Sequence, residues 1–115
     1  MRVLFCGDRN WTDRKKIASE IKKLSHDDLV IEGDANGADK LAGRLALYYG
    51  IPLAVFPAPW EYHGRAAGPI RNGWMLKYGS PDKVIAFHPD IANSKGTLDM
   101  VKRAKKAGIP VEVIE

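Results

Sequence analysis

Val3-Leu4-Phe5-Cys6 and Val84-Ile85-Ala86-Phe87 are apolar at every position, and this continuity indicates the kind of sheet that the chain forms. A strand with one face in water alternates apolar and polar residues, whereas a parallel strand covered by helices on both faces reads as an unbroken apolar run. The two stretches therefore predict strands of a parallel sheet with helices against both of its faces.

Five short apolar runs in all predict strands, and four helical patterns separate them. This alternation is typical of an α/β fold. With right-handed crossovers, the simplest arrangement is a five-stranded, mostly parallel sheet in the order 3-2-1-4-5, whose last strand carries Glu112 among apolar residues and should lie at an edge. We expect one Rossmann-like domain over residues 1–115, with strands at Arg2–Cys6, Leu29–Glu32, Pro52–Phe56, Lys83–Phe87 and Val111–Ile114.

The helical patterns have recognisable ends. Asp13 is suited to cap the first helix, because its carboxylate can accept hydrogen bonds from the free amides there. We expect the third helix from about Ala67 to Lys77 and the fourth from Gly96 or Thr97 to Ala107. The residues expected to face the core are Ile17, Ile21 and Leu24 in the first helix, Leu41, Ala42, Leu45, Ala46 and Tyr49 in the second, and Leu98, Val101 and Ala104 in the fourth.

Composition narrows the class of protein. Hydrophobic residues make up 45% of the chain and charged residues 28%, which argues against disorder. No apolar run approaches the roughly 20 residues of a membrane helix, and no signal segment precedes the first strand, so we expect no membrane association. The single cysteine, Cys6, is interpreted as a buried thiol in a reducing compartment, the cytoplasm.

The net charge of +4 suits an anionic partner without identifying it. Much of the basic excess falls within helical patterns, which is typical of solvated outer faces. The basic clusters are Arg14–Lys16, Lys22–Lys23 and Lys102–Lys106.

The unusual residues gather in the connections that lead from strand to helix. These segments, 7–13, 33–39, 57–72 and 88–97, combine glycine with charged, hydroxyl or aromatic side chains, whereas the return connections hold mainly plain turn residues. Ligands of open parallel sheets bind outside the carboxyl ends of the strands, at the switch point of the strand order. The loops Gly7–Trp11 and His88–Thr97 should therefore face each other across a cleft.

Two of these loops enter a helix through small residues, and helix N-termini attract anions. Ser94-Lys95-Gly96-Thr97 offers a hydroxyl, a cation and free amides to a phosphate, although capping alone is the plain alternative. The loop 33–39 has small residues too, but Asp34 and Asp39 would repel a phosphate. These carboxylates would instead accept hydrogen bonds from ribose hydroxyls or cap the helix.

The long third loop adds a cation and an aromatic ring. Arg71 lies near enough to the start of its helix to reach a phosphate with two hydrogen bonds. Trp11 and Trp60 are candidates to stack on a base or, alternatively, to plug the end of the sheet. The three histidines lie far apart and no Cys/His cluster is present, so we expect no metal site and no bound cofactor.

Taken together, these motifs resemble those of the SLOG superfamily, and within it the small YspA-like proteins. The resemblance implies a Rossmann-like fold that binds nucleotides or nucleotide-derived ligands such as relatives of ADP-ribose. The superfamily includes the Lonely Guy phosphoribohydrolases, which release a free base from a nucleoside monophosphate, and DNA-processing protein A. The matching strings are Cys6–Trp11 with Asp13, Glu32–Asp39, Ala66–Asn72 with Met75, and Ser94–Thr97 with Asp99 and Met100.

One departure from the phosphoribohydrolases bears on catalysis. Gly96-Thr97 and Arg71 match their motif, but the position of the motif's glutamate holds Met100, whose thioether cannot act as an acid or base. Asp99 is adjacent but points about 100° away around a helix. The resemblance therefore favours binding over catalysis, with Asp39, Arg71 and Asp99 as the candidate catalytic residues.

Three functions are predicted in order: binding of a nucleotide-derived ligand, hydrolysis of such a ligand, and nucleic-acid binding. Self-association is left open, because small Rossmann-like domains often associate. The residues expected to bind the ligand are Gly7, Arg9, Trp11, Gly33, Asp34, Gly37, Ala38, Asp39, Arg71, Asn72, Ser94, Lys95, Gly96 and Thr97.

Overall fold

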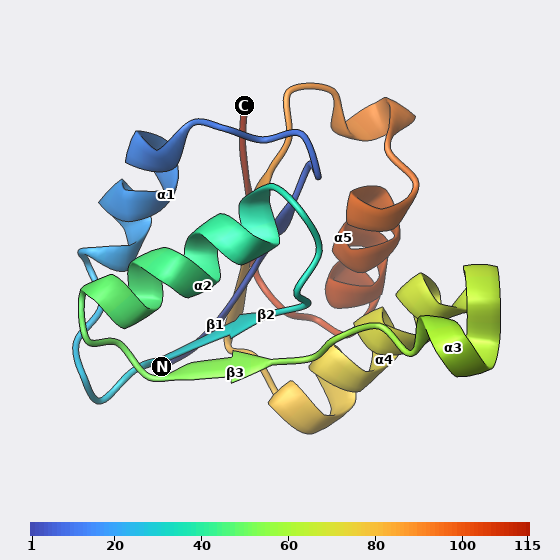
Figure 1. Cartoon of the computed structure of the whole chain (residues 1–115), viewed down its shortest axis with the longest axis horizontal. Coiled ribbons are helices and arrows are strands. Elements are labelled where there is room, and N and C mark those ends of the chain that lie inside the picture. The colour runs from blue at the N-terminus through green and yellow to red at the C-terminus, as the bar shows by residue number, and fades with distance from the viewer.

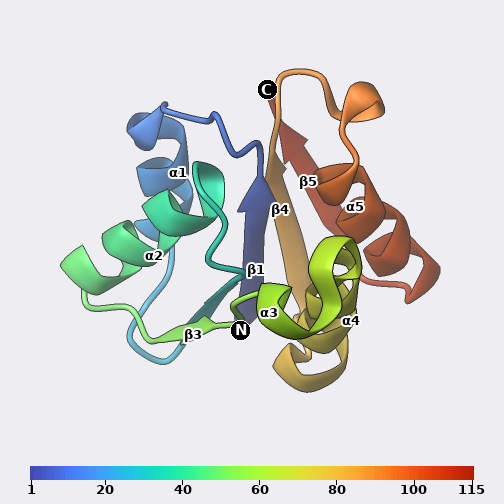
Figure 2. The same cartoon turned by 45° about the vertical axis from the view of Figure 1, so that its right-hand side comes forward.

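A five-stranded parallel sheet lies between two layers of helices in the computed structural model, which describes all residues 1–115. Figures 1 and 2 show α1 and α2 on one side of the sheet and α4 and α5 on the other. The strand order is β3-β2-β1-β4-β5, which confirms the predicted fold and topology. The strands are β1 (Arg2–Gly7), β2 (Leu29–Glu32), β3 (Leu53–Val55), β4 (Lys83–Phe87) and β5 (Val111–Ile114).

The two unbroken apolar runs form the adjacent strands β1 and β4, which pair from Val3 with Lys83 to Gly7 with Phe87. Successive side chains of a strand point to opposite faces. In β1, Phe5 enters the core under α1 and α2, whereas Leu4 enters the core under α4 and α5. Both faces of β1 are therefore buried, as the absence of polar residues predicts, and the two strands fix the centre of the molecule.

The outer strands differ from the central ones. β5 is an edge strand in which Glu112 and Val113 are exposed, as the interleaved charge predicts. β3 occupies the other edge and is shorter than the predicted Pro52–Phe56. Pro52 still accepts a hydrogen bond from the amide of Val30 (2.8 Å), but proline has no amide to return to a ladder.

The helices largely follow the predicted patterns. Asp13 caps α1 by accepting hydrogen bonds from the amides of Lys15 and Lys16, at 3.1 and 3.3 Å. α4 runs to Gly79 rather than Lys77, and Ser80 ends it in the left-handed conformation (φ 46°). The helices are α1 (Arg14–Ile21), α2 (Ala38–Tyr48), α3 (Trp60–His63), α4 (Ala67–Gly79) and α5 (Gly96–Lys106), with short 3-10 turns η1 (Gly64–Ala66) and η2 (Ile91–Asn93).

Three helical expectations need correction. Leu98 is only half-buried, because the inner face of α5 carries Met100 and Val101 instead. Tyr49 lies just past the end of α2 and is 38% exposed. The long third loop contains the short helix α3, which its mixture of proline, glycine and aromatic residues did not predict. No helix is both long and apolar enough to cross a membrane.

Candidate ligand-binding site

A cavity of about 690 Å³ opens at the carboxyl ends of β1 and β4. The β1–α1 loop, the β4–α5 loop and the start of α4 line it together, so the two predicted loops do share one cleft. Cavities that bind small molecules measure about 300–1,000 Å³. It is larger than the two grooves beside α1, which measure about 430 and 470 Å³.

Glycines hold the β1–α1 loop against the start of α2. A Cβ on Gly7 would overlap the carbonyl oxygen of Phe87 and lie 2.9 Å from the Cβ of Ala38. Gly37 has a positive φ (76°), and a Cβ there would overlap the backbone of Asp8 and Arg9. The carbonyl of Asp8 also accepts a hydrogen bond from the amide of Ala38 (3.1 Å). Backbone packs directly on backbone here.

This packing corrects two predicted ligand contacts. Neither Gly37 nor Ala38 lines the cavity. Gly37 is needed for the close approach of the β1–α1 loop, and the amide of Ala38 is already bonded to Asp8. Of the first amides of α2, that of Ala38 is bonded to Asp8, whereas that of Asp39 donates to no acceptor in the chain and belongs to a residue that carries a carboxylate.

The start of α5, by contrast, opens into the cavity. Ser94 Oγ accepts a hydrogen bond from the amide of Thr97 (3.1 Å), whereas the amides of Gly96 and Leu98 donate to no acceptor in the chain. A Cβ on Gly96 would meet nothing within 4 Å. Ser94, Lys95, Gly96 and Thr97 all line the cavity. A hydroxyl, an ammonium and free amides thus meet at one helix N-terminus, which favours an anion.

Asn72 ties this helix start to α4. Its Nδ2 donates to the carbonyl of Gly96 (3.3 Å) and to Asp99 Oδ2 (2.9 Å). Asp99 also accepts a hydrogen bond from Arg103 Nε (2.9 Å) and does not line the cavity. The structure therefore does not bring Asp99 to the cavity with the other predicted residues, because its carboxylate is bonded to Asn72 and Arg103.

Arg71 bridges the third loop and the end of β2. Its Nη1 donates to the carbonyl of Gly33, and its Nε donates to Asn72 Oδ1 (3.1 Å). A Cβ on Gly33 would overlap the guanidinium group. Gly33 does not line the cavity, so its predicted ligand contact is replaced by contact with Arg71, which does line it. Two hydrogen bonds hold the guanidinium in place before any ligand arrives.

Asp39 lies beside the cavity and is 4% exposed. Its Oδ2 accepts hydrogen bonds from the amides of Gly33 (3.0 Å) and Ala35 (3.4 Å), while Oδ1 forms no hydrogen bond within the chain. Burial raises the pKa of Asp39 to about 6, although the positive charge of Arg71 opposes this rise. Asp39 therefore shapes the loop and leaves one oxygen for a ligand.

Two more carboxyls lie near Asp39. Burial, and then the charge of Asp39, raise the pKa of Glu32 to about 7. Glu32 Oε1 accepts a hydrogen bond from the amide of Asp34 (3.0 Å). Asp34 does not line the cavity and pairs with Lys40 Nζ at 3.0 Å, so the structure does not place it with the other predicted ligand residues.

The inner wall of the cavity is apolar. Met75 and Met100 are each 1% exposed, and Cys6 is 6% exposed. Burial raises the pKa of the Cys6 thiol far above its usual range, so the thiol stays protonated and is no nucleophile. The side chain of Met100 thus contributes shape and no charge to this wall.

Cations and an aromatic ring stand around the opening. Arg9 and Arg65 are exposed, and Trp60 is 60% exposed. Trp11 does not line the cavity: it packs edge-on against Phe87 with ring centroids 5.6 Å apart. Its Nε1 donates to the carbonyl of Asp13 (2.9 Å), so Trp11 plugs the sheet and is not free to stack on a base.

Of the predicted ligand residues, nine line the cavity, and the sequence analysis missed several of their neighbours. Gly68, Arg71, Asn72 and Met75 recur at the spacing of one helix face, and this signal was sufficient to add Gly68 and Met75. His88 had no such signal; its Nδ1 accepts a hydrogen bond from the amide of Asp90 (2.9 Å), which leaves the proton on Nε2. The nine are Gly7, Arg9, Asp39, Arg71, Asn72, Ser94, Lys95, Gly96 and Thr97.

Comparison with known structures supports the fold. DNA processing protein A (DprA) from Streptococcus pneumoniae is similar over 99% of this chain, with a TM-score of 0.76 and 20% sequence identity. The match covers 50% of the DprA chain, so the present chain spans half the length of that protein. At this identity the likeness concerns the fold alone.

Comparison of sequences shows the family. The gene 61 protein of Mycobacterium phage D29 is 36% identical over 119 residues, which cover 96% of this chain and 93% of that protein. Residues 1–63 match the family described as YspA, cpYpsA-related SLOG. They span β1 to α3 and include the β1–α1 and β2–α2 loops. The resemblance found in the sequence motifs is thereby confirmed, and the chain belongs to the YspA, cpYpsA-related SLOG family.

Proposed function

We propose that the cavity binds a nucleotide or a nucleotide-derived ligand, with a phosphate group at the N-terminus of α5. The observation that carries the proposal is the pair of unbonded amides at Gly96 and Leu98. Gly96 lines the cavity together with Ser94 and Arg71, and Leu98 follows in the same first turn of α5. An anion there gains hydrogen bonds from the amides and attraction from the helix dipole and the guanidinium.

The rest of the cavity suits the rest of a nucleotide. Asp39 Oδ1 is free to accept a hydrogen bond from a ribose hydroxyl, because only Oδ2 is used within the chain. Met75 and Met100 offer an apolar wall, and the exposed ring of Trp60 is available to stack on a base. Phosphate, sugar and base thus each have a matching partner.

Calorimetric titration with AMP, ADP-ribose, NAD and cyclic AMP tests this proposal. We expect at least one of them to bind, and Arg71→Ala to weaken that binding about tenfold or more, as the loss of a charge-assisted hydrogen bond predicts. Lys77→Ala, on the exposed side of the same helix, is the matched control and should bind as the parent does. If none of the four ligands binds to folded protein, the proposal is wrong.

Hydrolysis of the ligand is the second candidate, and Asp39 is the observation that favours it. A carboxyl with a pKa of about 6 is present in both its protonated and its ionised form near neutral pH, so it can act as an acid or as a base. Its free Oδ1 lies at the cavity, whereas Met100 supplies no proton. Product analysis after long incubation distinguishes turnover from binding, and turnover that survives Asp39→Asn would remove Asp39 from the mechanism.

A nucleic-acid strand is a weaker candidate for this cavity. The name of the structural neighbour, DNA processing protein A, connects that protein with DNA. The carboxylates of Asp8 and Asp39 line the cavity, however, and carboxylates repel the closely spaced phosphates of a strand. A ligand with one or two phosphates avoids this repulsion more easily.

A further inference from the structure

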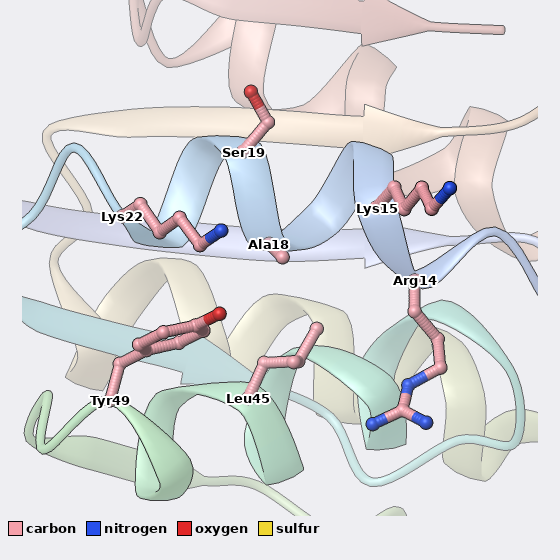
Figure 3. A pocket seen from close by; sticks show the side chains of 7 residues that line it. All are labelled: Arg14, Lys15, Ala18, Ser19, Lys22, Leu45 and Tyr49. Carbon is pink, nitrogen blue, oxygen red and sulfur yellow. The ribbon is translucent and has the colours of Figure 1, made fainter.

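A second concave surface lies on the outside of the helical layer, between α1 and α2. A groove of about 430 Å³ is lined there by residues of both helices, which Figure 3 labels: Arg14, Lys15, Ala18, Ser19 and Lys22 of α1, Leu45 of α2, and Tyr49 just past the end of α2. None of the residues that line this groove lines the cavity at the carboxyl ends of the strands. The two sites are therefore separate, and the proposed nucleotide binding does not use the groove.

The groove is basic, and its charges are not neutralised within the chain. Arg14, Lys15 and Lys22 form no salt bridge, and no carboxylate lines the groove. Arg14 and Lys22 are eight positions apart, about 12 Å along a helix. In Figure 3, Arg14 reaches toward α2 at one end of the groove, Lys22 runs along α1 above the Tyr49 ring at the other end, and Leu45 lies between them. The small side chain of Ala18 keeps the middle open.

Aromatic rings adjoin the basic groove at one end. Lys22 Nζ lies 5.5 Å from the centre of the Tyr49 ring. Tyr48 packs edge-on against Tyr49, with centroids 5.0 Å apart and an angle of 88°, and it is 79% exposed. The contact with Tyr49 leaves most of the Tyr48 side chain in solvent, so its ring can stack on a base.

We propose that this groove binds single-stranded nucleic acid. Arg14, Lys15 and Lys22 contact successive phosphates of the strand, and the Tyr48–Tyr49 pair stacks on an unpaired base. A row of unpaired cations beside exposed aromatic rings is the combination that single-strand binding uses. Charge alone would suit any anionic surface; the tyrosine pair is the feature that favours a strand with unstacked bases over a duplex or a membrane.

Fluorescence anisotropy with a labelled oligothymidylate tests the charges. A length of about 20 nucleotides exceeds the site size of single-strand binding folds, about 4–16 nucleotides. R14E/K15E/K22E should lose binding about tenfold or more at low salt. The control K102E/K105E/K106E changes the net charge by the same amount on exposed positions of α5 and should lose much less.

The salt dependence gives a second readout. Each phosphate contact on a single strand contributes about −0.7 to the slope of log affinity against log salt concentration. Loss of all three cations should therefore make the slope less steep by about 2. If the triple variant fails to fold, as circular dichroism would show, K22A and its control K102A test the same point. Equal losses in the groove and control variants would overturn the proposal, as would an absence of binding by the parent protein.

The tyrosine pair is tested separately. Tyr48→Ala should weaken binding of the oligothymidylate about tenfold, since stacking on one base is worth about 1–3 kcal/mol. Tyr78→Ala removes a tyrosine of similar exposure (61%) from α4 and should leave binding unchanged. Equal binding of a duplex of the same length, or binding to phosphatidylserine vesicles without binding to the oligothymidylate, would overturn the assignment to single strands.

Discussion

The N-termini of α2 and α5 look alike in sequence but differ in the structure. Both helices begin after small residues at the carboxyl ends of strands, where an anion site is expected. At the start of α2, the Ala38 amide bonds to Asp8 and Gly37 packs against the β1–α1 loop, while the unbonded amide of Asp39 lies in a residue whose carboxylate repels an anion. The start of α5 is open, with the amides of Gly96 and Leu98 unbonded. Small residues thus allow close backbone packing at the start of α2, whereas at the start of α5 they leave the amides accessible to a ligand.

Matched glycine substitutions should separate the two helix starts most clearly. Gly37→Ala adds a Cβ that overlaps the backbone of Asp8 and Arg9, at a φ of 76° that L-residues rarely adopt. We expect it to lower the free energy of unfolding by about 3 kcal/mol or more. Gly96→Ala adds a Cβ into open space and should change stability by less than about 1 kcal/mol.

Urea denaturation of both variants measures the difference. The m-values should agree with that of the parent protein, so that the shift in midpoint reports stability. Equal destabilisation by the two substitutions would show that the start of α5 is packed as tightly as the start of α2.

The buried carboxyls behind α2 should make stability depend on pH. Both Glu32 and Asp39 have raised pKa values, about 7 and about 6, because burial disfavours their charged forms. Below about pH 4 the two carboxyls are protonated in the folded and in the unfolded protein, and their contribution to the free energy of unfolding is complete. It is lost as the pH rises to about 7, because the unfolded protein releases these protons first. The size of this loss is on the order of 3 kcal/mol per group.

Glu32→Gln should flatten this dependence, because an amide does not titrate. Denaturation at several pH values between about 4 and 8 measures it. Glu112→Gln, which removes an exposed carboxyl that pairs with Lys83 at 3.4 Å, is the control and should keep the slope of the parent protein. A Glu32→Gln variant with the parent's full pH dependence would contradict the assignment to this carboxyl.

The hydroxyl at the start of α5 should have a smaller effect on stability than Gly37 or the buried carboxyls. Ser94→Ala removes the acceptor for the Thr97 amide and should cost about 1 kcal/mol, as other helix caps do. Thermal unfolding measures this cost. Ser80→Ala, at the end of α4, tests a weaker hydroxyl contact (3.4 Å) at the other end of a helix and should cost less. A Ser94→Ala variant as stable as the parent protein would mean that the Oγ bond contributes nothing to the cap.

The sequence was sufficient to predict the strand order and the location of the site. Unbroken apolar runs fixed β1 and β4, and chemistry-bearing loops pointed to the carboxyl ends of the strands. Which side chains reach the cavity was less predictable. Trp11 packs on Phe87, Asp34 turns to Lys40, and Asp99 is taken up by Asn72 and Arg103. Each of these depends on partners distant in sequence or on local rotamers, which spacing alone does not determine.

The basic groove could not be predicted from the sequence either. The basic residues of α1 were interpreted as a solvated helix face, and they are exposed in the structure. Their neighbours Leu45 of α2 and Tyr49 at its end are more than twenty positions away, and these residues form a groove only because the two helices pack together. A surface that two helices share leaves no contiguous motif in the chain.

Amide shifts in a nitrogen–proton correlation spectrum, recorded during titration with AMP and ADP-ribose, test the central claim most directly. A phosphate at the open helix start should move the amide signals of Gly96, Thr97 and Leu98 most and leave that of Ala38, already bonded to Asp8, nearly unchanged. Shifts centred on Ala38 and its neighbours, with the α5 signals unmoved, would contradict it.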